Sequence, residues 1–207
     1  MPILRSLGAR HQRLVHSRRV AALARHFAEL IPTRHSVLDV GCGDGLIDSL
    51  VARERPDLKI AGVDVLIRPA AHIPVAAFDG ERLSFCDASW DTVLLCDVLH
   101  HSEQPVTLLQ EAARVARHRV LIKDHMLEGV LAGATLRLMD FVGNAPHGVV
   151  LPYNYLTPSQ WADAFRQTGL VSTDMRRKLD LYPPLADWIF GRSLHFIASC
   201  RVIAATG

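Results

Sequence analysis

The sequence predicts an α/β fold in which helices cover both faces of a parallel sheet. Short apolar segments alternate with helical ones from about residue 36 to residue 123. These segments are continuously apolar, as strands buried on both faces are. A glycine-rich turn follows the first of them. With 207 residues, 49% hydrophobic and 21% charged, the chain is expected to form a single globular domain over residues 1–207.

The alternation is clearest in the N-terminal part of the chain. A helical segment is expected over residues 10–31 of the N-terminal region (1–34), because apolar residues recur on one face and Pro32 ends it. Further helices are expected from Leu46 and over residues 104–116. The expected strands are Ser36 to Val40, Lys59 to Val65, Pro74 to Phe78, an apolar run within Trp90 to Leu99, and Arg119 to Lys123.

After Lys123 the pattern changes. We interpret residues 126–156 as a lid or substrate-binding insertion, in which Tyr153, Asn154 and His147 are candidate substrate contacts. The elements expected here and beyond are an extra helix over 127–141, a helix over 158–168 capped by Thr157, and closing strands over 170–181 and 194–203, with a break at Pro183 and Pro184 between them.

The turn formed by Gly41, Gly43 and Gly45 lies between an expected strand and an expected helix. Glycines permit positive φ and let a ligand approach the backbone, and a helix N-terminus offers free N–H groups to a carboxylate or a phosphate. Asp64 ends the next expected strand, where a carboxylate can accept both ribose hydroxyls of an adenosine. The sequence therefore predicts an adenosine-containing ligand.

Two classes of adenosine ligand compete for this turn. A dinucleotide site prefers GxGxxG, whereas this chain has GxGxG. Asp39 precedes the first glycine by two residues, and its carboxylate would repel a pyrophosphate but suit an ammonium or sulfonium group. S-adenosylmethionine is therefore favoured over NAD, and a nicotinamide oxidoreductase stays as an alternative.

With these motifs the chain resembles the class I S-adenosylmethionine-dependent methyltransferases, in particular small-molecule enzymes such as those of quinone biosynthesis. The resemblance covers roughly residues 35–125 and implies a Rossmann-like, doubly wound sheet of seven strands that is mostly parallel with an antiparallel C-terminal strand. The motifs that carry it are Val37 to Gly45, Gly62 to Asp64, Phe78 to Phe85 followed by Asp87 to Asp91, and Asp97 to His101.

The resemblance also implies which residues hold S-adenosylmethionine. Those expected at its amino-acid end are Asp39, Gly41, Gly43 and Gly45, with the backbone of Cys96 near the methionyl group. Those expected at its adenosine are Asp64 on the ribose, Val65 and Asp79 on the adenine, and Gly80 beside them.

Polar residues follow the fourth and fifth expected strands, whose carboxyl ends meet at one edge of the sheet. His101 and His125 are candidate bases for a phenol or hydroxyl acceptor, since histidine titrates near neutral pH. Asp97, His100 and Asp124 are candidate substrate contacts, and the adjacent rings of His100 and His101 are expected to diverge. A divalent metal on Asp97, Asp124 and His125 is a weaker alternative, because hard cations prefer more oxygen ligands; we therefore predict no metal.

Composition limits the partners. The formal net charge of +2 gives no support to a general nucleic-acid binder, and no apolar run is long enough to span a bilayer. The four scattered cysteines suggest a reduced, cytoplasmic protein. The arginines before Val20 are interpreted as a solvated helix face rather than an RNA site, and this helix could also pack on a second subunit of a homodimer. Trp188 and Phe196 are assigned to core or interface.

The sequence therefore predicts an S-adenosylmethionine-dependent methyltransferase acting on a small organic acceptor. O-methylation is slightly favoured because of the histidines. An RNA- or protein-modifying methyltransferase and a non-catalytic module that keeps the methyltransferase fold are the alternatives.

Overall fold

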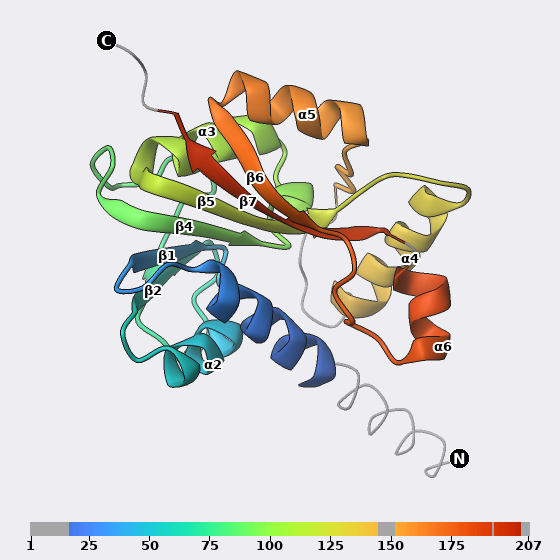
Figure 1. The fold of residues 1–207 in the computed structure, drawn as a ribbon, viewed down its shortest axis with the longest axis horizontal. Coiled ribbons are helices and arrows are strands. Elements are labelled where there is room, and N and C mark those ends of the chain that lie inside the picture. The colour runs from blue at the N-terminus through green and yellow to red at the C-terminus, as the bar shows by residue number, and fades with distance from the viewer. Residues whose placement is uncertain (1–16, 145–151, 192, 204–207) are drawn as a thin grey trace.

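A computed structural model describes residues 17–144, 152–191 and 193–203 (Figure 1). It contains a seven-stranded sheet in the order β3-β2-β1-β4-β5-β7-β6. Strands β1 to β5 pair in parallel, and β7 is antiparallel to both of its neighbours. The predicted fold class is thereby confirmed. The strands are β1 (Ser36–Val40), β2 (Lys59–Asp64), β3 (Val75–Ala77), β4 (Trp90–Cys96), β5 (Ala116–His125), β6 (Leu170–Arg176) and β7 (His195–Val202).

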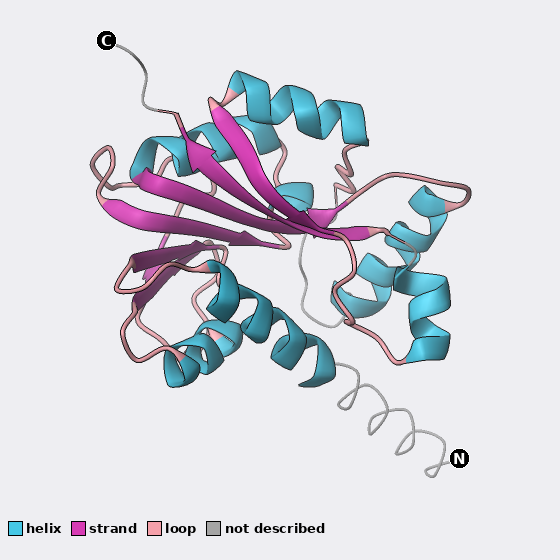
Figure 2. Ribbon diagram, viewed as in Figure 1, coloured by secondary structure: helices cyan, strands magenta, loops and turns pink. Residues whose placement is uncertain are grey.

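Helices cover both faces of this sheet (Figure 2). One face carries α3 (Pro105–Val115) and α5 (Pro158–Gln167), and the other carries α2 (Leu46–Glu54) and the N-terminal helix of residues 17–30. Each face has its own buried apolar cluster, as a sheet of continuously apolar strands requires. The shorter or peripheral helices are η1 (Leu99–His101), α4 (Ala132–Asn144), α6 (Pro184–Ala186) and η3 (Asp187–Gly191).

Local sequence signals explain several element ends. Thr157 caps α5, because its side chain accepts a hydrogen bond from the Gln160 N–H while its own N–H donates to Gln160 Oε1, and Pro158 occupies the first turn. This cap was predicted. In the N-terminal helix, Leu23 and Phe27 are fully buried against the sheet. Hydrophobic burial therefore holds this helix in place.

Three predicted boundaries were wrong. The extra helix begins at Ala132 rather than at residue 127, because Gly129 turns the chain with a φ of +94°. Strand β6 ends at Arg176 rather than at residue 181, since Leu179 and Leu181 leave the sheet to pack with the N-terminal helix. Strand β5 begins three residues earlier than expected.

The chain topology brings the carboxyl ends of β1, β2, β4 and β5 to one edge of the sheet, next to the glycine turn. Ligands of doubly wound sheets bind at this edge. Residues 145–151 of the predicted lid lie outside the described part of the chain. Within the described part, each helix is too short or too polar to cross a membrane.

Candidate functional site

The glycine turn is built to bring the backbone close to its neighbours. Gly41, Gly43 and Gly45 have φ values of +77°, +61° and +71°, which residues other than glycine rarely adopt. A Cβ atom on Gly41 would lie 2.4 Å from Cγ2 of Val98, whereas a Cβ atom on Gly43 would meet no atom of the described residues within 4 Å. The turn is therefore packed at Gly41 against the segment that follows β4, and it is open at Gly43.

Beside the turn, two carboxyl groups meet. Asp39 of β1 and Asp48 of α2 are buried and share a hydrogen bond. Oδ1 of Asp39 and Oδ2 of Asp48 have no donor partner in the described part of the chain. Burial and the charges of Asp48 and Asp64 raise the pKa of Asp39 well above its ordinary value, and burial raises the pKa of Asp48 to about 6. A positively charged group placed beside the two carboxyl groups would therefore favour their ionised forms.

Asp64 is oriented by backbone groups at the end of β2. Its Oδ2 accepts a hydrogen bond from the Gly43 N–H at 2.8 Å, and its Oδ1 accepts one from the Leu66 N–H at 2.8 Å. Val65, next in the chain, is 67% exposed. An exposed valine between ordered polar groups provides an apolar platform beside the Asp64 carboxylate.

The other predicted adenosine contacts lie near this platform. A Cβ atom on Gly80 would be 3.4 Å from Val65. Asp79 is exposed, and its Oδ1 accepts hydrogen bonds from the backbone of Glu81 and Arg82, which lowers its pKa. Cys96 ends β4 half-buried. The structure therefore places the predicted cofactor contacts around one sheet edge.

Where β4 ends, Asp97 lies between two positive side chains. Its carboxylate forms ion pairs with Lys123 of β5 and with Arg19 of the N-terminal helix. Burial opposes ionisation, but these charges hold the pKa of Asp97 well below its ordinary value. Asp97 also has a φ of +59°, a costly conformation that persists where the surroundings impose it. Asp97 is therefore held in place as an anion.

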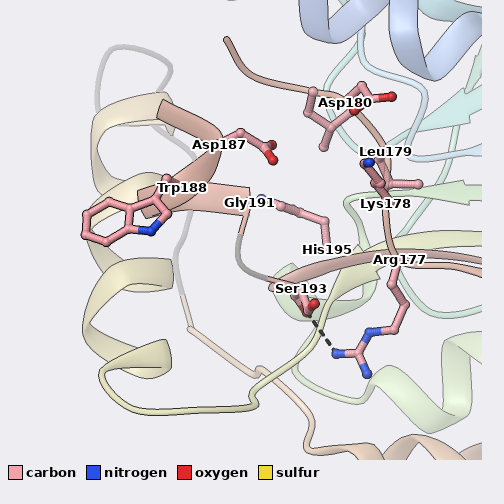
Figure 3. Close-up of a pocket in the computed structure, with 10 residues that line it drawn as sticks. Arg177, Lys178, Leu179, Asp180, Asp187, Trp188, Gly191, Ser193 and His195 are labelled. Carbon is pink, nitrogen blue, oxygen red and sulfur yellow. Dashed lines mark hydrogen bonds between the residues drawn. The ribbon is translucent and has the colours of Figure 1, made fainter. Parts of the chain in front are cut away.

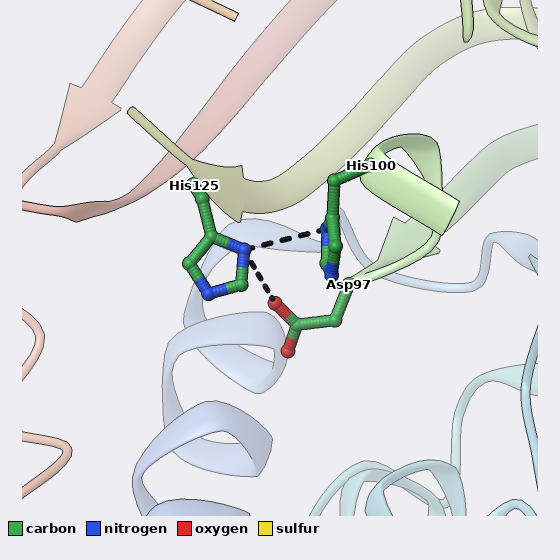
Figure 4. A group of neighbouring side chains, drawn as sticks. All are labelled: Asp97, His100 and His125. Carbon is green, nitrogen blue, oxygen red and sulfur yellow. Dashed lines mark hydrogen bonds and ion pairs between the residues drawn. The ribbon is translucent and has the colours of Figure 1, made fainter. Parts of the chain in front are cut away.

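The imidazoles of His100 and His125 lie beside this carboxylate (Figure 4). His125 Nδ1 is 3.3 Å from His100 Nδ1 and 3.9 Å from Asp97 Oδ1. Burial alone would lower the pKa of His100, but the Asp124 carboxylate, 2.7 Å from His100 Nδ1, raises it above its ordinary value. Burial and the neighbouring His100 lower the pKa of His125 to about 4, so His125 is neutral near pH 7.

His101 joins the same group, so the expectation that its ring diverges from that of His100 was wrong. The tight turn of η1 keeps the two ring centroids 4.1 Å apart. Nδ1 of His101 is buried and has no hydrogen-bond partner in the described part of the chain. Oδ2 of Asp140, from α4, lies 3.6 Å from His100 Nε2 and accepts a hydrogen bond from Tyr155.

The predicted loop contacts have different surroundings. Asn154 fastens the loop to η1, because its Nδ2 donates to the Ser102 carbonyl at 2.8 Å and its N–H to the His100 carbonyl at 3.2 Å. Tyr153 is half-buried, with the Arg137 guanidinium 5.8 Å from its ring centroid. His147 lies outside the described residues.

A cavity of about 430 Å³ lies between the segment after β6 and the helix η3 (Figure 3). Arg177, Lys178 and Asp180 line one side, and Asp187 and Trp188 the other. His195 also lines it, and its Nδ1 lies 3.4 Å from Nζ of Lys123. The cavity therefore adjoins the charged group at the strand ends.

Comparison with known families decides what this fold and site belong to. A family model described as a methyltransferase domain matches residues 9–174, most of the chain. The chain belongs to this methyltransferase family. It is an enzyme of the class I type, and its cofactor is S-adenosylmethionine.

One curated relative matches part of the methyltransferase. It is 34% identical over 107 residues to the bifunctional methionine biosynthesis protein MetXA/MetW of Rhodopirellula baltica, a match that covers 45% of this chain and 17% of that protein. The chain thus spans only a small part of that relative's length.

Solved structures share the fold of the methyltransferase. A chain in the complex of the Haloferax volcanii Trm112 methyltransferase activator with a methyltransferase superposes with a TM-score of 0.65 at 17% identity, covering 87% of this chain and 88% of that one. An S-adenosylmethionine-dependent methyltransferase from Mesorhizobium loti gives 0.62 at 13% identity, covering 86% and 96%. At such identities the likeness shows the fold alone.

The described residues of the methyltransferase fit its cofactor. Among the described residues, one buried Asp39 oxygen has no donor, which suits an ammonium group, and the open side of Gly43 leaves room for a ligand. The exposed Val65 offers a surface for a purine. Asp64 lies on the same edge with both oxygens ordered. These features could hold the amino-acid end and the adenosine of one molecule.

Sequence reasoning missed several members of the site. Arg19, interpreted as part of a solvated face, is instead ion-paired with Asp97, because the N-terminal helix packs across the end of β4. Lys123 and Asp48 carried a weak signal, as charged residues within apolar segments. Asp140 carried none, since its partners are distant in sequence. Of the two aromatic residues assigned to core or interface, Phe196 is in the core and Trp188 is 78% exposed.

Proposed function

We propose that this methyltransferase moves a methyl group from S-adenosylmethionine to a hydroxyl oxygen of a small organic molecule. The observation that carries the proposal is the histidine group of η1 and β5, which adjoins the cofactor turn through the contact between Gly41 and Val98. In the transfer the acceptor oxygen bonds to the methyl carbon, the carbon–sulfur bond breaks with its electron pair going to sulfur, and the hydroxyl proton leaves.

The chain's contribution is binding and orientation, since the sulfonium carries the reactivity. Asp39 would hold the cofactor ammonium, with Gly41, Gly43 and Gly45 around the amino-acid end and the Cys96 backbone near the methionyl group. Asp64 would hold the ribose, and Val65, Asp79 and Gly80 would surround the adenine. The buried Asp39 oxygen, which has no donor within the described ranges of the chain, and the ordered carboxylate of Asp64 support this assignment.

The acceptor side is proposed from the strand-end residues. His101 or His125 would take the acceptor proton, and Asp97, His100 and Asp124 would orient the acceptor with Tyr153 and Asn154. The nearby cavity of about 430 Å³ is of a size that suits a small molecule. Its wall of both basic and acidic side chains favours a polar acceptor over a purely apolar one.

A thermal melt with S-adenosylmethionine, S-adenosylhomocysteine and NAD tests the cofactor contacts. A ligand at 100 times its Kd stabilises the folded state by about 2.7 kcal/mol. We expect a shift with the two adenosyl ligands and none with NAD, a loss of the shift in Asp64→Asn, and its retention in Glu54→Gln, which removes an exposed charge on α2.

The acceptor class is tested by measuring S-adenosylhomocysteine release with phenols, aliphatic alcohols, amines, RNA and a protein extract. We expect turnover with a hydroxyl compound. Turnover with amines, RNA or protein and not with any hydroxyl compound would replace the proposed acceptor class.

A further inference from the structure

His100, His101 and Asp140 lie together with one nitrogen or carboxylate oxygen from each within 4.8 Å of the others. We propose that these three side chains, the His–His–Asp site, bind one divalent transition-metal ion. Two imidazoles and one carboxylate are a donor set that suits zinc or ferrous iron and is poor in the oxygen ligands that calcium and magnesium require. The inference does not depend on the identity of the methyl acceptor.

The spacing of the donor atoms fits a shared ion. His100 Nε2 and Asp140 Oδ2 are 3.6 Å apart. Ligands about 2.0–2.1 Å from a tetrahedral zinc ion lie about 3.4 Å from one another. A small adjustment of two side chains would therefore bring both atoms to bonding distance of one ion.

His101 gives an independent indication of a ligand. Its Nδ1 is buried, yet it has no hydrogen-bond partner in the described part of the chain. Buried nitrogens of this kind are normally paired. The ring of His101 is 4.1 Å from that of His100, centroid to centroid, so a cation held by His100 would also be within reach of His101.

The residues behind the site are arranged as they are around metal-bound histidines. Asp124 lies 2.7 Å from His100 Nδ1 and is fully buried, so it holds that nitrogen as the N–H donor and leaves the lone pair on Nε2, the atom that approaches Asp140. A carboxylate on the second nitrogen of a ligating histidine is a common feature of metal sites. Tyr155 in turn donates a hydrogen bond to Asp140.

The neighbouring group of Asp97, His100 and His125 also has its donor atoms close together, but its charges oppose a metal ion. Asp97 is already paired with Lys123 and Arg19, which would repel a further cation at that carboxylate. His100 Nδ1 is engaged by Asp124. The metal alternative considered from the sequence, on Asp97, Asp124 and His125, therefore does not carry the proposal.

Three protein ligands leave a coordination position open on a four-coordinate ion. An acceptor hydroxyl bound there would become more acidic, as metal-bound water does. A cation would occupy the imidazole nitrogen that a proton-accepting His101 needs, so the two roles of His101 exclude each other.

The test is metal binding by the full chain, prepared without a polyhistidine tag and stripped with a chelator. Zn²⁺ is measured by equilibrium dialysis with elemental analysis, and Co²⁺ by its visible absorption, which reports coordination by protein. We expect one ion per chain. His101→Ala and Asp140→Asn should weaken binding by about 100-fold or more, since loss of supporting residues alone costs 10–100-fold.

His118→Ala is the matched control, because it removes an exposed histidine near the opposite end of β5 and should leave binding unchanged. Absence of saturable binding, or equal binding by the wild type and both site variants, would overturn the proposal. If Asp140→Asn does not fold, as judged by its thermal melt, the partly exposed His101 carries the comparison. The S-adenosylmethionine shift, measured with and without chelator, reports the cofactor site separately.

Discussion

Replacing Asp48 by Asn should stabilise the ligand-free protein. Burial raises the pKa of Asp48 from 3.8 to about 6. Above pH 6 the folded chain therefore holds an ionised carboxylate in buried surroundings that disfavour its charge. Each pKa unit corresponds to 1.36 kcal/mol, and the shift therefore costs about 3 kcal/mol of folding free energy. Asparagine removes the ionisable group, and its amide oxygen can still accept the hydrogen bond from Asp39.

The pH dependence of this effect has a definite sign. A carboxyl group whose folded pKa is above its unfolded value stabilises the protonated folded state, so its cost is absent below about pH 4, develops between pH 4 and 6, and is complete above pH 6. The free energy of unfolding of Asp48→Asn should exceed that of the wild type by up to about 3 kcal/mol at pH 7.5 and by little at pH 4.

The assay is urea unfolding at several pH values between 4 and 8. Glu54→Gln removes one exposed acidic residue from the same helix and should show no such pH-dependent gain. If Asp48 also helps Asp39 to hold the cofactor ammonium, Asp48→Asn should bind S-adenosylmethionine more weakly although it is more stable. An Asp48→Asn variant that is equally or less stable than the wild type at pH 7.5, with the same pH profile, would refute the reasoning.

Five other substitutions test the site. Gly41→Ala should abolish folding or cofactor binding, because its new methyl group would lie 2.4 Å from a valine side-chain carbon. Gly43→Ala has open space but a φ of +61°, so it should cost about 1 kcal/mol of stability in urea unfolding. Equal behaviour of the two variants would contradict the proposed packing. His101→Ala and His125→Ala should each keep the cofactor Kd within a few-fold, and turnover should fall about 100-fold in whichever acts as the base, while unchanged turnover in both would exclude a histidine base. Lys123→Met should destabilise the fold by about 3 kcal/mol, because it leaves the carboxylate at the end of β4 with one positive partner instead of two, and a change below 1 kcal/mol would show that Arg19 alone suffices.

The elements that the sequence predicted well are those with local physical causes. The turn of Gly41 to Gly45, the cap at Thr157 and the apolar strands β1 and β4 each depend on residues within a few positions of one another. The predicted cofactor residues gather at one sheet edge for the same reason, since parallel strands place their carboxyl ends together.

Tertiary contacts decided the features of the fold and the site that the sequence did not predict. Strand β6 stops at Arg176 because Leu179 and Leu181 pack in the apolar cluster of the sheet face that carries the N-terminal helix. Nothing near them in sequence indicates this packing. Pairing of Arg19 with Asp97, and the approach of Asp140 to His100, join residues from separate elements.

By itself, the sequence determined the fold class, the cofactor and the chemical nature of the strand-end residues, because periodicity, glycine spacing and side-chain chemistry act over short distances along the chain. Only the tertiary structure decided which charges neutralise one another and which nitrogen of His101 is left without a partner among the described residues. Those outcomes depend on how close distant segments come when the helices pack on the sheet, and on the burial that packing imposes on each ionisable group.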